Sequence, residues 1–236
     1  MRPNRISLAS PPADVSHGRL LIFAKAPVPG HVKTRLMPFL DAEGCARLQR
    51  RLIERTLEMT ANATLCPVEL WCAPDCNDPF FATCARRLDV QTRRQQGRDL
   101  GMRMHLALSK TLVHARFGII IGCDCPSLGA AYLTQACEIL ADGIPVVLGP
   151  AEDGGYVLIG ARRATAALFD GIAWGTCAVL EQTRARLRSL RWHWVELAPL
   201  WDIDRPEDLA RLTAKELAAL GVYSTDHSRQ PCAISG

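Results

Sequence analysis

The 236-residue sequence lacks a long hydrophobic run, although hydrophobic residues make up 48% of it. Apolar stretches such as residues 20–24 and 119–121 extend over only a few positions. A helix that crosses a bilayer needs about 20 predominantly apolar residues, so we expect no membrane span. Residues 1–18 are polar and lack the apolar core of a secretory signal, which predicts a cytoplasmic protein.

Blocks of like charge are also missing. The 28 basic residues are interleaved with 24 acidic ones, and the formal net charge is only +4. Nucleic-acid-binding surfaces are typically signalled by clustered basic residues, so we expect no nucleic-acid partner. Lysine is scarce, with four residues in the chain, and two of them, Lys25 and Lys33, fall in one short segment.

The ten cysteines do not form a recognisable metal or disulfide pattern. The cluster at positions 66, 72, 76 and 84 contains no C-x-x-C pair and no histidine at zinc spacing. Without export, a disulfide framework is not expected. We therefore predict free thiols that behave mostly as small hydrophobic residues.

Hydrophobic patterning predicts an α/β fold in which strands and helices alternate. Strands are expected at residues 19–24, 68–73, 89–94, 118–122, 145–148, 156–159 and 193–197, and helices at 41–63, 79–87, 100–114, 130–141, 164–169, 177–190 and 206–220. This alternation predicts one domain, residues 18–222, with a mainly parallel central sheet flanked by helices and with flexible tails at 1–17 and 223–236. Ligands of such sheets bind at the carboxyl ends of the strands.

The loop after the first predicted strand concentrates positive charge. Lys25, Lys33 and Arg35 lie within eleven residues, in a segment stiffened by two prolines and Gly30. Point charges and a planar guanidinium together suit a diphosphate, whereas a solvated basic turn is the alternative. The loop is not a Walker A motif, because Val32 stands where that motif has glycine, and no G-x-G-x-x-G follows the strand.

Asp124 ends the apolar strand predicted at residues 118–122, between Gly122 and Pro126. A carboxylate at this position is suited to a divalent cation that bridges phosphates. The alternative is that Asp124 caps the helix that begins near Leu128.

A third strand-end loop holds paired acids and paired glycines, Glu152-Asp153-Gly154-Gly155. Glycines next to a carboxylate would let a substrate approach the backbone closely. Because Asp-Gly is also a strong hairpin signal, a simple hairpin turn is the alternative.

The last acidic pair, Asp202 and Asp204, would share a face if its backbone were extended. The two residues would then complete a metal site with Asp124, although Asp204 could instead only begin the following helix. Basic phosphate contacts and acidic metal ligands at one sheet edge are what transfer chemistry on a nucleoside di- or triphosphate requires.

Four motifs occur in a characteristic order: FAKAPVPGxVKTRL at 23–36, GxDCPSL at 122–128, GPAxDGGY at 149–156 and DxDxPEDL at 202–209. With them, the chain resembles a bacterial family of GT-A-fold glycosyltransferases that is often called radical-SAM/selenodomain-associated, some relatives of which are linked to arsenosugar biosynthesis. This family is similar in turn to molybdenum-cofactor and phospholactate guanylyltransferases. The resemblance covers about residues 19–221, and the departures are His31, where arginine is common, and Cys123, where serine is common.

The resemblance implies a nucleotide-diphospho-sugar transferase fold with a Mg²⁺- or Mn²⁺-dependent site. The residues that match the phosphate-contacting loop are Lys25, Gly30, Lys33 and Arg35. The metal ligands would be Asp124, Asp202 and Asp204, and Lys33 would share the charge of the departing phosphate.

The resemblance also suggests where base and acceptor bind. Gln96 and Gly101 look like the base-contacting Gln-x-x-x-Leu-Gly stretch of sugar nucleotidyltransferases, although Gln96 could be a surface residue. Asp153 would bind the acceptor or act as its general base, with Gly154 and Gly155 leaving room. A sugar could stack on Trp174, for which a core position is the alternative.

We therefore expect a metal-dependent glycosyltransferase that moves a sugar from a nucleotide-diphosphate sugar to a small acceptor. The alternative enzyme is a nucleotidyltransferase that joins an NTP to a phosphorylated or carboxylated small molecule and releases pyrophosphate. A nucleotide-binding module without catalysis is disfavoured, because all of the acids at positions 124, 153, 202 and 204 are present. The helical tails are compatible with a homodimer.

Overall fold

The computed structural model describes residues 14–222, so of the two predicted tails only residues 14–17 fall within it. Between residues 14 and 222, the helices are all too short or too polar to cross a membrane. The cysteines in this part of the chain are free thiols, and most of them are buried, as predicted.

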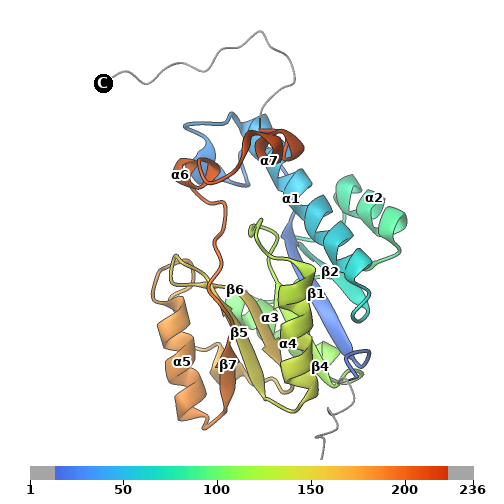
Figure 1. The fold of residues 1–236 in the computed structure, drawn as a ribbon, viewed down its shortest axis with the longest axis vertical. Helices are drawn as coiled ribbons and strands as arrows, with labels where there is room; N and C mark the ends of the chain where they lie inside the picture. Colours follow the sequence, from blue (N-terminus) through green and yellow to red (C-terminus); the bar gives the residue numbers. More distant parts are fainter. Residues whose placement is uncertain (1–13, 223–236) are drawn as a thin grey trace, which may run out of the picture.

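A seven-stranded sheet forms the middle layer of the molecule (Figure 1). Its strands are β1 (Gly18–Lys25), β2 (Val68–Ala73), β3 (Gln91–Arg94), β4 (Phe117–Ile121), β5 (Val146–Pro150), β6 (Tyr156–Ala161) and β7 (Trp194–Glu196). They lie in the order β3-β2-β1-β4-β6-β5-β7. Only β6 runs antiparallel to its neighbours, β4 and β5, and the other pairs are parallel. The predicted α/β fold with a mainly parallel sheet is confirmed.

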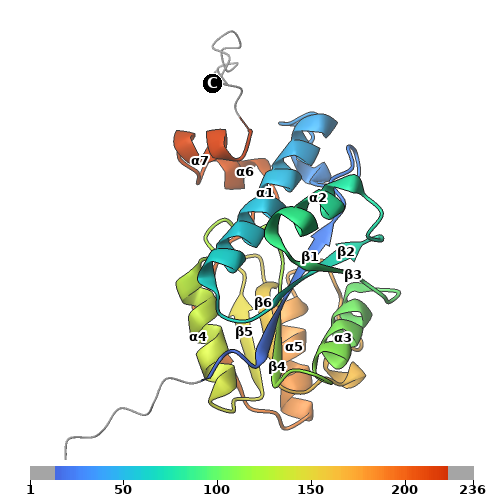
Figure 2. The same cartoon turned by 90° about the vertical axis from the view of Figure 1, so that its right-hand side faces the viewer.

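Helices cover both faces of the sheet. They are α1 (Ala42–Ala63), α2 (Pro79–Leu88), α3 (Leu100–Thr111), α4 (Ala130–Ala141), α5 (Val179–Ser189), α6 (Pro206–Leu209) and α7 (Ala214–Ala219), with short 3₁₀ turns η1 (Thr34–Leu36) and η2 (Ala166–Leu168). The core on one face joins α1, α2 and α4, and the core on the other joins α3 and α5, which Figure 2 shows from the side. Alternate residues of β1 feed the two cores, because successive side chains of a strand point to opposite faces.

The helix starts follow from capping residues in the sequence. Asp41, Asp78 and Asp99 precede α1, α2 and α3, and each side chain accepts a hydrogen bond from a backbone N–H of the first turn. Such a cap satisfies a donor that has no partner within the helix. The apolar side chains of α3 include Met104, which is buried, and Leu100, which is 43% exposed and lines the candidate site.

The helix predicted at residues 206–220 is wrong, because two short helices, α6 and α7, replace it. Thr213 begins the second helix: its hydroxyl accepts from the backbone N–H of Glu216, and the Glu216 carboxylate accepts from the backbone N–H of Thr213. This reciprocal capping interrupts the helical pattern, and its T-x-x-E signature was present in the sequence. The helix predicted at 164–169 is also only the 3₁₀ turn η2.

The topology places the candidate site. β1 lies between β2 and β4, so the loop that follows β1 and the loop that follows β4 leave the sheet side by side. Crevices at such switch points are where open α/β sheets bind ligands. Figure 1 shows α6 and α7 beyond this same end of the sheet, next to the start of α1.

Candidate active site

A cavity of about 1010 Å³ opens at the carboxyl ends of β1 and β4. The predicted residues that line it are Lys25, Lys33, Arg35, Asp124, Asp202 and Asp204. The structure thus brings together the basic loop, the strand-end aspartate and the late acidic pair, which come from three distant parts of the sequence.

Lys33 is the centre of this arrangement. Its side chain is only 5% exposed, and its Nζ lies 2.7 Å from Oδ1 of Asp124. The same Nζ donates a hydrogen bond of 2.6 Å to the carbonyl oxygen of Ile203. A buried ammonium must be paired and hydrogen-bonded to be tolerated, and Lys33 meets both conditions. It therefore links three segments and is not part of a solvated basic turn.

The other two cations of the loop are more exposed. Lys25 donates a hydrogen bond of 2.7 Å from Nζ to the carbonyl oxygen of His31, which closes the loop on itself. Arg35 forms an ion pair with Asp204. Gly30 has a φ of +76°, and no atom lies within 4 Å of the place that a Cβ would take. Its contribution is therefore a left-handed turn, which glycine adopts without strain. Both cations remain close enough to the cavity to meet an anionic ligand.

Asp124 does not cap the following helix, since Gly129 precedes α4 as its first flanking residue. Its carbonyl oxygen instead accepts a hydrogen bond of 2.8 Å from the backbone N–H of Ile203. Its Oδ1 lies against the Lys33 ammonium, but the side chain as a whole is 47% exposed and lines the cavity. A carboxylate that is open to the cavity on one side can still take a cation as a ligand.

Asp202 is the acid most affected by these surroundings. Burial raises the pKa of Asp202 to about 7, and the neighbouring carboxylates Asp124, Asp153 and Asp204 add to the increase, whereas Lys33 opposes it. A carboxyl group that is buried beside other carboxylates ionises more easily when a cation is bound next to it.

These observations fit a divalent cation held by few protein ligands. Within residues 14–222, no three side chains of His, Cys, Asp or Glu converge closely enough to hold a metal ion by themselves. Magnesium, however, is usually bound by one or two carboxylates together with substrate phosphates. Asp124 and Asp202 both line the cavity and supply that number of carboxylates.

The loop that carries Asp153 is a hairpin, as the alternative reading expected. It joins the antiparallel strands β5 and β6, and Oδ1 of Asp153 accepts a hydrogen bond of 2.8 Å from the backbone N–H of Gly155. A Cβ at Gly154 would lie 2.2 Å from the carbonyl oxygen of Cys177, so backbone fills the space beside Gly154. The expectation that Gly154 leaves room for an acceptor is therefore not met on this side. Asp153 does not line the cavity, but its charge acts on Asp202.

Trp174 is partly buried and packs against the core, which is closer to the alternative than to a sugar-stacking role. Its ring lies 6.4 Å from Tyr156 in an edge-to-face arrangement and 6.5 Å from Phe169, between centroids. A Cβ at Gly101 would lie 2.7 Å from the Trp174 ring, so Gly101 permits this packing. Neither Trp174 nor Gly101 lines the cavity.

Gln96 also lies away from the cavity, where its Oε1 accepts a hydrogen bond of 2.7 Å from Lys110. Its neighbour Gln95 lines the cavity instead, and sequence reasoning missed it. The Gln95 amide nitrogen donates to the carbonyl oxygens of Trp71, at 2.7 Å, and Ala24, at 3.4 Å. Because both N–H groups are used, the amide oxygen is the group that Gln95 can offer to a ligand. The alternation of side chains at the end of β3 was the available signal.

The comparisons with known proteins agree with this geometry. Residues 56–176 match the model of a family described as "Uncharacterized protein conserved in bacteria (DUF2064)". The chain belongs to this family. No curated protein is similar enough in sequence to match it.

Solved structures extend the likeness over most of the chain. A protein of Desulfovibrio desulfuricans G20, provisionally named a nucleotide-diphospho-sugar transferase, is 28% identical with a TM-score of 0.75, and the match covers 89% of this chain and 100% of that one. The inositol-1-phosphate CTP transferase of T. maritima is 11% identical with a TM-score of 0.55, over 88% of this chain and 96% of that one. A CMP:2-keto-3-deoxy-manno-octonic acid synthetase in complex with CTP is 14% identical with a TM-score of 0.53, over 86% and 99%. The two more distant likenesses share the fold, and two of the three structural neighbours are transferases by name.

Proposed function

We propose that this DUF2064 protein is a metal-dependent glycosyltransferase, which binds a nucleotide-diphosphate sugar in the cavity and transfers the sugar to a small acceptor. The observation that carries this proposal is the buried Lys33 ammonium, which is held between the carboxylate of Asp124 and the carbonyl oxygen of Ile203 at the carboxyl ends of the strands. A fixed positive charge inside a cavity lined by carboxylates is suited to a ligand that brings both phosphate and a cation.

The basic loop neutralises charge as the nucleoside diphosphate departs. Lys33 is already in place, while the exposed Lys25 and Arg35 move from their partners to the phosphate oxygens. Groups that are fixed before the reaction stabilise developing charge at no further cost in reorganisation. Lys33 is therefore the residue whose loss affects transfer most.

Asp124 and Asp202 would hold the Mg²⁺ or Mn²⁺ ion, with Asp204 beside them once Arg35 turns to phosphate. When bound, such an ion supplies charge stabilisation on the diphosphate oxygens. In its absence, Lys33 partly balances the charge of Asp124.

The nucleoside would lie toward α3. Gln95 presents its amide oxygen there, and Leu100 and Met104 add an apolar surface along the same cavity. Asp153 remains our candidate for the acceptor hydroxyl, because its charge acts on Asp202, which does line the cavity.

A nucleotidyltransferase is the second candidate function. It is supported by the two more distant structural neighbours, since one is named a CTP transferase and the other is a synthetase in complex with CTP. The resemblance to molybdenum-cofactor and phospholactate guanylyltransferases points the same way. The same residues serve both reactions, since both place negative charge on phosphate oxygens.

The released product distinguishes the two reactions. The purified protein is incubated with Mn²⁺, a panel of nucleotide sugars or NTPs, and candidate acceptors, and the phosphorus-containing products are identified. Glycosyl transfer releases a nucleoside diphosphate, whereas nucleotidyl transfer releases pyrophosphate. Release of pyrophosphate alone would overturn the proposed glycosyl transfer and support the second candidate.

A further inference from the structure

Arg211, in the turn between α6 and α7, contacts both segments that carry the acids of the site. Its guanidinium donates two hydrogen bonds to the carboxylate of Glu152, at 2.7 and 3.0 Å. The same guanidinium lies over the ring of Trp201, 4.3 Å from its centroid. Glu152 precedes Asp153 in the chain and Trp201 precedes Asp202, so one side chain joins the two acid-bearing segments.

Within residues 14–222, backbone hydrogen bonds fix the chain before Trp201 and after Asp202, but not at these two residues. The N–H of Glu152 donates to the carbonyl of Leu200 at 2.9 Å, and further along the N–H of Ile203 donates to the carbonyl of Asp124 at 2.8 Å. Within the part of the chain that the structure describes, neither Trp201 nor Asp202 forms a backbone–backbone hydrogen bond. Their placement therefore depends on side chains.

The packing of residues 201–204 explains how a contact outside the cavity can place an acid inside it. Trp201 and Ile203 pack in one hydrophobic cluster, whereas Asp202 and Asp204 line the cavity, so the side chains of this segment alternate between two sides. Trp201 meets Arg211 outside the cavity, so fixing Trp201 fixes the direction of its neighbour Asp202. Arg211 is well suited to this task because its planar fork can bind a carboxylate in two places and stack on an aromatic ring.

We propose that Arg211 is a positioning residue that holds the acid-bearing segment 201–204 against the hairpin 151–155, and so sets the cation-binding geometry of the site. The proposal about metal binding rests on the proposed function, whereas the proposal about the segment's order does not. Arg211 itself does not line the cavity and takes no part in the chemistry.

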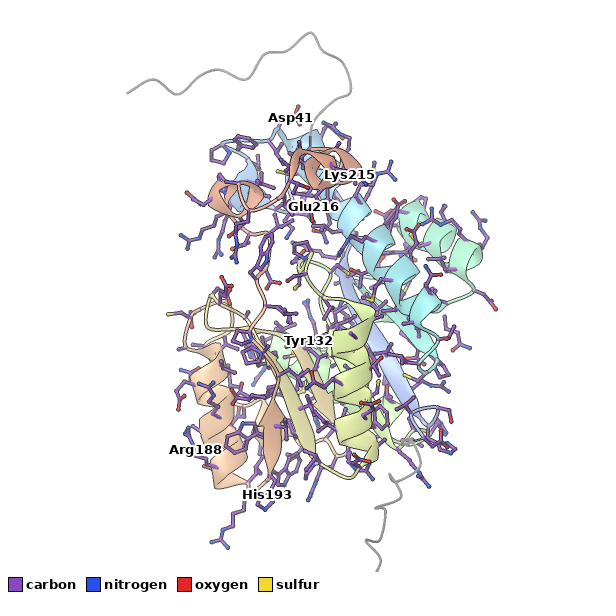
Figure 3. All side chains as sticks on the ribbon, in the orientation of Figure 1. Asp41, Tyr132, Arg188, His193, Lys215 and Glu216 are labelled. Atoms are coloured by element: carbon purple, nitrogen blue, oxygen red, sulfur yellow. The ribbon has the colours of Figure 1, made fainter. Side chains whose placement is uncertain are left out.

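Hydrogen–deuterium exchange of the whole protein tests the structural half without any ligand. In Arg211→Ala, the amides of Glu152 and Ile203 should exchange about fivefold to thirtyfold faster than in the wild type, the change expected for losing a two-point ion pair and a cation–π contact. Arg188→Ala is the matched control, because Arg188 also donates two hydrogen bonds to one carboxylate, that of Glu181 on α5. Figure 3 shows Arg188 at the opposite end of the molecule from Lys215 and Glu216 on α7.

Equal exchange in Arg211→Ala and the wild type would overturn the proposal. Arg211→Lys should give an intermediate rate, since it keeps the charge but not the fork. If Arg211→Ala does not fold, Glu152→Gln provides the same test from the other side of the ion pair.

Binding of a nucleoside diphosphate, with and without Mn²⁺, tests the second half by titration calorimetry. Arg211→Ala should lose most of the gain in affinity that Mn²⁺ gives, while affinity without Mn²⁺ stays as in the wild type. An unchanged Mn²⁺ gain together with faster exchange would show that Arg211 orders the segment without positioning the acids, which contradicts the proposal. If even the wild type binds no nucleoside diphosphate, the proposed function fails, and the exchange result still decides whether Arg211 holds the segment.

Discussion

A single buried lysine organises the candidate site. Lys33 contacts Asp124, which is 91 positions further along the chain, and Ile203, which is 170 positions further along. Its side chain is almost fully buried. Its charge is thus available at a fixed place, which a flexible surface lysine does not offer.

Replacing Lys33 with alanine should weaken binding of nucleoside diphosphates much more than binding of nucleosides. The loss of one charge-assisted contact, about 1.5–3 kcal/mol, corresponds to a fall in affinity of about tenfold to a hundredfold. Calorimetric titration with both ligand types measures the difference. Lys215→Ala, on the exposed side of α7, is the control, and equal losses for both ligand types would contradict the phosphate-binding role.

Asp124→Asn should remove the Mn²⁺ dependence of nucleotide binding while the fold survives. The amide keeps the size of the carboxylate but not its charge, and a neutral amide is a poorer ligand for a hard cation. Binding is measured with Mn²⁺ and with a chelator, and Asp142→Asn at the exposed end of α4 is the control. An unaltered Mn²⁺ effect in the Asn variant would show that Asp124 is not a metal ligand.

At the residue scale, the sequence predicted which charged residues come together at the cavity, but not which groups each of them contacts. The positions of Lys33, Asp124 and Asp202 in loops that follow strands were predicted from apolar patterning and loop chemistry. The contact of Lys33 with Ile203 was not, because it depends on how a distant segment crosses the sheet. Gln95 was missed because Gln96 was chosen from the resemblance, and a shift of one residue turns a side chain to the other face.

At the scale of elements, the hairpin between β5 and β6 is fixed by a close backbone contact. Gly154 has a φ of +89°, and a Cβ there would meet the carbonyl oxygen of Cys177 at 2.2 Å. The hairpin and the segment that precedes α5 are therefore packed backbone to backbone.

Gly154→Ala should reduce the free energy of unfolding by about 1–3 kcal/mol more than Gly143→Ala does, because overpacking adds to the cost of the positive φ. Gly143 is the matched control, with a φ of +104° and nothing within 4 Å of its added Cβ. Urea denaturation followed by circular dichroism measures both. Equal destabilisation would mean that the contact with Cys177 relaxes without cost.

The capping of α7 gives a second prediction about an element. Thr213→Ala removes the side-chain cap of Glu216 and should cost about 1 kcal/mol of stability. Thr134→Ala is the control, because Thr134 lies inside α4 and its hydroxyl bonds only to the helix backbone. Urea midpoints that shift equally in the two variants would contradict the cap.

Element types were largely predictable because apolar periodicity and capping residues agree along most of the chain. Strand β2 and helix α4 have the bounds that patterning predicted. The break between α6 and α7 was missed because a continuous apolar spacing hid the cap at Thr213. The antiparallel direction of β6 follows from its short hairpin, which the Asp-Gly signal indicated only as an alternative.

At the scale of the whole molecule, the fold brings an early loop and a late segment to the same sheet edge. β1 and β4 lie side by side, and residues 201–204 cross over their carboxyl ends to meet them. The likeness to the Desulfovibrio desulfuricans structure covers 89% of the chain. The site is thus a property of the sheet and of the segment that precedes α6, not of one motif.

The most direct test of this account is a thermal-unfolding experiment on the whole protein with Mn²⁺ and a panel of nucleoside diphosphates, nucleotide sugars and NTPs, against a metal-only control. A ligand present at 100 times its dissociation constant should add about 2.7 kcal/mol of stability, which shifts the midpoint visibly. The account predicts stabilisation by at least one nucleotide sugar and its nucleoside diphosphate, lost in both Lys33→Ala and Asp124→Asn. Stabilisation by no nucleotide, or stabilisation that survives in both variants, would contradict it.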